Sequence, residues 1–181
     1  MSGSGVVKSG NVGFTLLELM ATLAVMLILL GLGLPSYQQQ RQAHQLLAAA
    51  DGLYGHIQLA RNEARARQDP AINIYFFAGN RWCYRITDRS DSECDSCSAI
   101  CDIGQDGLLR GANWSDYPDV TLQEIAYTGH ELGIGIRRGT LGAGHVTFAS
   151  GAMQVSVKTS GLGRIRLCSV DASLAGVWPC A

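Results

Sequence analysis

A long apolar stretch near the N-terminus constrains this chain more than any other feature. Residues 16–34 contain only two polar side chains, those of Glu18 and Thr22. As a helix, the apolar run of residues 14–34 is about 32 Å long, close to the ~30 Å thickness of a bilayer's hydrocarbon core. No second run of this kind follows. We therefore expect residues 14–35 to form a single membrane-spanning helix.

The residues on either side of this run suggest how the segment is used. Residues 1–13 are short and polar, with one lysine as their only charge, and are typical of a leader on the cytoplasmic side. A lone carboxylate at the position of Glu18 costs roughly 2.5–3.5 kcal/mol in a membrane, so it needs a partner of opposite charge. The alternative is a secretory signal peptide. Gly31 and Gly33 have the spacing of its cleavage site, but Pro35 follows almost at once and obstructs processing.

The residues Gly13-Phe14-Thr15-Leu16-Leu17-Glu18-Leu19 resemble the prepilin signal of type IV pilins and type II secretion pseudopilins. The resemblance implies that a prepilin peptidase cuts between Gly13 and Phe14 and that the new amine of Phe14 is methylated. It also implies that Glu18 pairs with the N-terminal amine of a neighbouring subunit during assembly, which gives the buried carboxylate its opposite charge. Such a protein crosses the bacterial inner membrane once with its head in the periplasm, and later joins other major and minor pilins in the extracellular pilus.

The period of the apolar residues predicts the structure of the remaining chain. In residues 36–69 apolar side chains recur at steps of three and four, which predicts an amphipathic helix that ends at Asp69-Pro70. Beyond it the period becomes two, and residues 72–77 and 81–86 flank Ala78-Gly79-Asn80, the pattern of a β-hairpin. Further strands are expected at 120–125, 132–137, 145–149, 153–159 and 164–168.

One long helix followed by antiparallel strands predicts an α+β fold, with residues 70–181 as a β-rich head. This order of elements is similar to the architecture of type IV pilins. Within the head, residues 88–119 carry eight acidic and two basic side chains, a net charge of −6. We expect a solvent-exposed insertion there. Its carboxylates could hold calcium, but they do not match an EF-hand loop.

Six cysteines follow the membrane segment: Cys83, Cys94, Cys97, Cys101, Cys168 and Cys180. In an exported compartment an even number favours disulfides, and we predict a bond between Cys168 and Cys180. The pairing of the other four stays open. Cys94-x-x-Cys97 with two further thiolates could hold zinc. Zinc sites usually have two separate Cys-x-x-Cys-like pairs, however, and this sequence has one, so we expect no metal site.

The sequence shows no catalytic signature, so we expect no enzyme and no cofactor. His130-Glu131-Leu132-Gly133-Ile134 begins like a zinc-protease helix but has isoleucine in place of the second histidine. The glycines of residues 133–139 lack the spacing of a dinucleotide site and open no predicted helix. No serine lies in a nucleophile elbow.

The C-terminal part of the head is basic, with a net charge of +3 over residues 130–181. In the strand predicted at 164–168, Ile165 and Leu167 can face the core while Arg164 and Arg166 project together from the other face. The simplest interpretation is that these arginines keep an edge strand soluble or pair with acids of the insertion. Guanidinium groups beside a glycine-rich turn also suit phosphate oxygens.

The residues Gly163-Arg164-Ile165-Arg166, followed by Cys168, resemble the Gly-Arg-x-Arg motif of FimT-type minor pilins in the FimT/GspH family. Residues 146–151 and 61–64 also resemble that family. The resemblance implies non-specific binding of double-stranded DNA for uptake in natural transformation. Gly163, Arg164 and Arg166 would form the site, and charge alone adds Lys158, Arg137 and Arg138 as flanking contacts. Because the whole chain is nearly neutral, with 14 basic and 15 acidic residues, such a site must be local.

Two other functions fit the same leader. A FimU-like minor pilin primes or caps pilus assembly, and a GspH-type pseudopilin belongs to type II secretion. In the FimU-like case the arginines would be structural or would lie at a subunit contact, whereas a GspH-type pseudopilin would move protein cargo. DNA binding instead predicts phosphate-led affinity, with log affinity falling against log salt with a slope of roughly −3 if about three or four phosphates are contacted.

Overall fold

The computed structural model describes residues 15–68, 72–79, 81–88, 94–99, 101, 103, 110–136, 139–171, 174 and 176–180, and only the backbone of 32–35. The predictions for Gly13, Phe14, Arg137 and Arg138 lie outside these residues. The chain divides into two compact units, residues 1–39 and residues 40–181.

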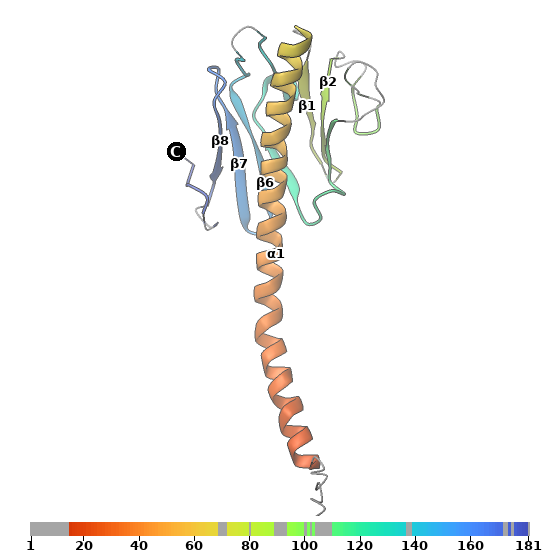
Figure 1. Ribbon diagram of the computed structural model, residues 1–181, viewed down its shortest axis with the longest axis vertical. Helices are drawn as coiled ribbons and strands as arrows, with labels where there is room; N and C mark the ends of the chain where they lie inside the picture. The colour runs from red at the N-terminus through yellow and green to blue at the C-terminus, as the bar shows by residue number, and fades with distance from the viewer. Residues whose placement is uncertain are drawn as a thin grey trace, which may run out of the picture. The chain divides into compact units, whose positions relative to one another are not determined.

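A single helix, α1 (Leu16–Arg67), includes both the apolar and the amphipathic segments predicted from the sequence (Figure 1). The backbone N–H of Glu18 donates to Oγ1 of Thr15 at 3.2 Å, so the Thr15 side chain caps the first turn. Glu18 and the described side chains of residues 15–31 are exposed. α1 is long and apolar enough to cross a membrane, which is compatible with an anchor.

In the described part of the head, eight strands form two antiparallel sheets. The first has the order β3-β2-β1-β5, with β1 (Asn73–Phe77), β2 (Cys83–Thr87), β3 (Arg110–Asn113) and β5 (Glu131–Gly133). The second has the order β4-β6-β7-β8, with β4 (Thr121–Ile125), β6 (Gly144–Ser150), β7 (Met153–Thr159) and β8 (Ile165–Ser169). A short 3-10 helix, η2 (Thr128–His130), precedes β5. The expected hairpin is confirmed as β1–β2, and the α+β fold class is confirmed.

The hydrophobic core lies between residues 40–67 of α1 and both sheets (Figure 1). Leu46, Leu53 and Ile57 of the helix belong to one core cluster with side chains of both sheets, such as Phe76 and Phe148, and with Trp82, which directly precedes β2. The indole N–H of Trp82 donates to the carbonyl of Val120 at 2.8 Å, so the largest buried ring also satisfies its polar atom. Every buried residue that the structure describes lies between positions 46 and 174. Residues 40–181 therefore contain a complete core of their own.

The expectation that residues 88–119 form a solvent-exposed insertion holds only in part among the residues that the structure describes, because Cys94, Cys101, Ile103 and Ala112 are buried while residues such as Ser115 and Asp116 are exposed. β3 pairs with β2, Ile103 is fully buried in the main core, and Cys94 and Cys101 pack against Tyr75. The high density of charge concealed these contacts, because a few apolar residues and disulfides are enough to fix a segment that is otherwise polar.

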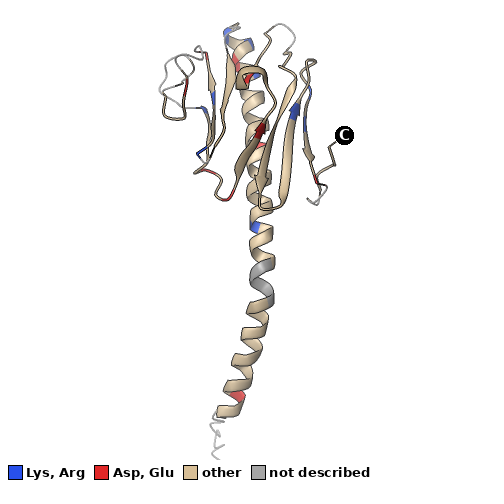
Figure 2. Ribbon diagram, turned by 180° about the vertical axis from the view of Figure 1, so that it is seen from behind, with Lys and Arg blue, Asp and Glu red and all other residues tan. Residues whose placement is uncertain are grey.

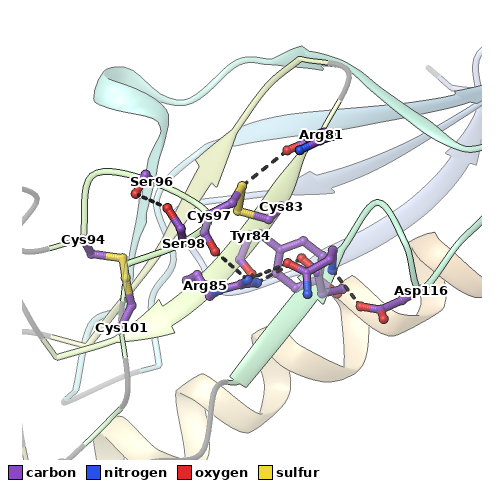
Figure 3. The surroundings of a disulfide bond; sticks show 12 residues. Arg81, Cys83, Tyr84, Arg85, Cys94, Ser96, Cys97, Ser98, Cys101 and Asp116 are labelled. Atoms are coloured by element: carbon purple, nitrogen blue, oxygen red, sulfur yellow. Dashed lines mark hydrogen bonds between the residues drawn. A yellow bond between two sulfur atoms is a disulfide. The ribbon is translucent and has the colours of Figure 1, made fainter.

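Two disulfides and one arginine hold this segment (Figure 3). The bonds join Cys83 to Cys97 and Cys94 to Cys101, which resolves the pairing left open by the sequence. The buried guanidinium of Arg85 donates to the carbonyls of Cys97 and Ala112 at 3.1 and 3.2 Å. The described cysteines are therefore disulfide-bonded, and the described residues contain no group of side chains suited to a metal ion.

Candidate nucleic-acid interface

The β7–β8 hairpin presents three basic side chains together. In the antiparallel register Lys158 of β7 lies opposite Arg166 of β8, and Arg164 lies two residues before Arg166. Ile165 and Leu167 are half-buried against the core, whereas Arg164 and Arg166 are exposed. This confirms the predicted alternation. Figure 2 shows basic segments on the two strands nearest the C-terminus.

The turn before Arg164 requires a glycine at position 163. Gly163 has a φ of +82°, a left-handed conformation that residues with a Cβ rarely adopt. A Cβ there would also overlap the carbonyl oxygen of Gly139. The turn is closed by bonds from the Gly163 N–H to the Ser160 carbonyl (2.8 Å) and from the Ser160 N–H to the Arg164 carbonyl (3.0 Å). The glycine of the Gly-Arg-x-Arg motif therefore has a steric role.

A third arginine, Arg61 of α1, contacts this turn. Nη1 of Arg61 donates to the carbonyl of Gly163 at 3.2 Å, and its Nη2 lies close to where side chains at 139 and 163 would project. Arg61 was not among the site residues expected from the sequence. The available signal was its position on the buried face of α1, four residues after Ile57 and three before Ala64. A cation on that face requires acceptors from the tertiary structure.

The basic side chains line two adjoining grooves. One, of about 340 Å³, is lined by Lys158, Arg164, Arg166, Leu167, Cys168, Trp178 and Pro179. The other, of about 430 Å³, is lined by Lys158, Thr159, Ser160, Leu162, Arg164 and Arg166. Within the described part of the chain, no carboxylate lies within salt-bridge distance of Arg164 or Arg166. The interpretation that they pair with acids of the insertion thus finds no support among the described residues.

The C-terminal segment forms one wall of the first groove. The predicted disulfide between Cys168 and Cys180 is confirmed. The Ser169 N–H donates to the carbonyl of Trp178 at 2.8 Å, and the Cys180 N–H donates to the carbonyl of Ser169 at 2.9 Å. These bonds fix the backbone of residues 178–180 alongside β8.

A polar pair lies elsewhere in the head, on the inner side of α1. Nδ1 of His56 is 2.9 Å from the hydroxyl of Tyr84. Burial lowers the pKa of His56 below its ordinary value of 6.5 and is the main cause that raises the pKa of Tyr84. Both rings are therefore held in their neutral forms at neutral pH. The pair has a structural role, because neither residue lines the basic grooves.

Comparison with known protein families identifies the family to which the chain belongs. Residues 49–163 match the family model described as type II transport protein GspH. The chain belongs to the GspH family. No curated protein and no solved structure matches the chain. Membership of the GspH family supports a role as a pseudopilin or minor pilin and association with other subunits of that kind. The match begins at residue 49 and ends at Gly163, so it includes the last part of α1 and strands β1 to β7. It includes neither the apolar first half of α1 with Glu18 nor Arg164 and Arg166.

Proposed function

We propose that this GspH-family protein is a FimT-type minor pilin whose head binds extracellular DNA, without sequence preference, for uptake in natural transformation. The observation that carries the proposal is the shared position of Lys158, Arg164 and Arg166 on one face of β7–β8, beside a groove. Anion binding is the chemistry that this surface favours.

The spacing of the three cations suits a phosphate backbone. Directly opposite side chains on antiparallel strands have Cβ atoms about 4.5–5.5 Å apart, and residues two apart on a strand are separated by about 6.8 Å. Each strand of DNA carries one charge per about 3.4 Å along its axis, so Arg164 and Arg166 span about two phosphates. These contacts carry no base information, which is why the proposed binding is non-specific.

The anchor belongs to the same proposal. A prepilin peptidase would cut the chain between Gly13 and Phe14, the amine of Phe14 would be methylated, and Glu18 would pair with that amine of a neighbouring subunit. Membership of the family and the apolar, exposed first half of α1 support this course. The head would first lie in the periplasm and later on the extracellular pilus. Several heads along one filament would then increase a weak single-site affinity through avidity.

The proposal is tested by measuring the affinity of the head, residues 40–181, for labelled duplex DNA at low salt. The variant R164Q/R166Q is expected to bind roughly tenfold more weakly or worse, since two of three charge-assisted contacts are lost. The matched control is R41Q/R81Q, which removes the same charge from exposed positions outside the grooves. Equal affinity in the two variants, or no binding by the wild type, would refute the proposal.

A second function, a pseudopilin of type II secretion, is favoured by the family match itself. On this alternative the basic grooves contact another pseudopilin or a secreted protein. Deletion of the gene separates the two functions. Loss of DNA uptake with normal protein secretion supports the DNA-binding minor pilin, and loss of secretion with normal uptake supports the pseudopilin.

A further inference from the structure

Trp178 stands out as an aromatic side chain exposed beside three cations. The residue is 84% exposed, although tryptophan is normally buried for most of its surface. The other two tryptophans are better covered, since Trp82 is fully buried and Trp114 is 45% exposed with the Arg81 guanidinium 5.8 Å from its ring centre. Because this ring lies in a groove that Lys158, Arg164 and Arg166 also line, it is available to a ligand that those cations bind.

The backbone that carries this ring is fixed. Residues 178–180 are bonded to Ser169 through two backbone hydrogen bonds and to β8 through the Cys168–Cys180 disulfide. The ring therefore lines a defined groove together with Arg166 and Lys158. An aromatic side chain on a fixed backbone loses less conformational entropy when a ligand covers it than one on a mobile segment does.

The chemistry of the groove selects a ligand that carries both phosphates and accessible aromatic faces. We propose that this surface binds single-stranded DNA in preference to duplex, with Trp178 stacking on an unpaired base while Arg164, Arg166 and Lys158 contact the backbone. The inference rests on the DNA-binding function proposed above. In a duplex the base faces are covered by their neighbours, so only a single strand or a frayed end offers them to the indole.

A second apolar side chain supports the same arrangement. Leu162, at the tip of the β7–β8 turn, is 92% exposed and lines the adjoining groove. Each of the two grooves that the basic side chains line therefore also contains an exposed apolar residue, Trp178 in the first and Leu162 in the second. A backbone tracked by basic side chains, with bases placed on apolar surfaces beside it, is the usual way in which proteins hold single strands without sequence preference.

The test uses the full chain in neutral detergent with three labelled probes of about 12 nucleotides, within the usual range of single-strand site sizes. The probes are a thymidine strand, a mixed-sequence duplex and an abasic strand. Trp178→Ala is expected to weaken binding of the thymidine strand by about five- to 150-fold. It is expected to change binding of the duplex and of the abasic strand less than twofold. Trp114→Ala is the matched control, expected to leave all three affinities unchanged.

The outcomes separate this inference from the function on which it rests. Selective loss of thymidine-strand binding in Trp178→Ala supports the stacking role. If Trp178→Ala binds all three probes like the wild type while R164Q/R166Q loses them, the inference is overturned and the DNA-binding function stands. If the wild type binds none of the probes, both are overturned. Quenching of tryptophan fluorescence by the thymidine strand, absent in Trp178→Ala, gives a second readout that does not depend on affinity.

Discussion

Gly163→Ala tests whether the turn before the two arginines is as constrained as the geometry indicates. The left-handed conformation of Gly163 costs a residue with a Cβ about 1–2 kcal/mol. The overlap of that Cβ with the carbonyl oxygen of Gly139 adds a further cost of about 1–3 kcal/mol, as is typical of overpacking. The cost is not easily relieved, because the overlapping atom belongs to the backbone and not to the end of a flexible side chain. We therefore expect the free energy of unfolding of the head to fall by about 2–5 kcal/mol.

The same turn provides the control. Gly161 is two residues earlier, its φ is not in the left-handed range, and a Cβ there would meet nothing within 4 Å. Gly161→Ala is expected to change the free energy of unfolding by less than about 0.5 kcal/mol, as other surface substitutions do. Urea denaturation of residues 40–181 measures both variants. Equal stability of Gly163→Ala and Gly161→Ala would refute the steric account of the motif glycine.

Three further predictions concern other parts of the chain. Because the pKa of His56 is lower in the folded state, the unfolded state binds more protons between pH 6.5 and the folded pKa, and stability is lost as the pH falls through this window. Urea denaturation at a series of pH values should show a smaller loss of stability in His56→Gln. The loss should remain in His44→Gln, because His44 is at an exposed position. Replacing Cys168 and Cys180 with serine should lower the free energy of unfolding by about 3 kcal/mol, from the loop-closure entropy of the short loop they close, and unchanged stability would contradict it. Gly13→Ala should leave a larger, unprocessed form in the inner membrane, visible by immunoblot, whereas normal maturation would contradict the leader.

Elements defined by periodicity were predictable from the sequence. The long helix and the β1–β2 hairpin follow from steps of three and four and then of two, and the structure places them within a few residues of the expected bounds. The alternation of arginine and apolar residues over positions 164–167 could be predicted for the same reason. The Cys168–Cys180 disulfide could be predicted because it joins the last strand to the nearby C-terminal segment.

Features that depend on the path of the chain were not predictable. β3 lies in a segment whose charge suggested solvent exposure, and its pairing with β2 depends on how the disulfide-bonded loop returns to the sheet. The role of Arg61 depends on a carbonyl about a hundred residues away in the sequence. The exposure of Trp178 likewise follows from how the C-terminal segment lies along β8. Contacts of this kind have no local signature.

The salt dependence of DNA binding tests the central claim most directly, because it counts the phosphates that the protein contacts. For duplex DNA each neutralised phosphate contributes about −0.9 to the slope of log affinity against log salt. With three cations engaged, the wild-type head is predicted to show a slope of about −3, R164Q/R166Q a slope of about −1, and R41Q/R81Q the wild-type slope. A slope that R164Q/R166Q leaves unchanged would contradict the claim that Arg164 and Arg166 form the DNA-binding surface.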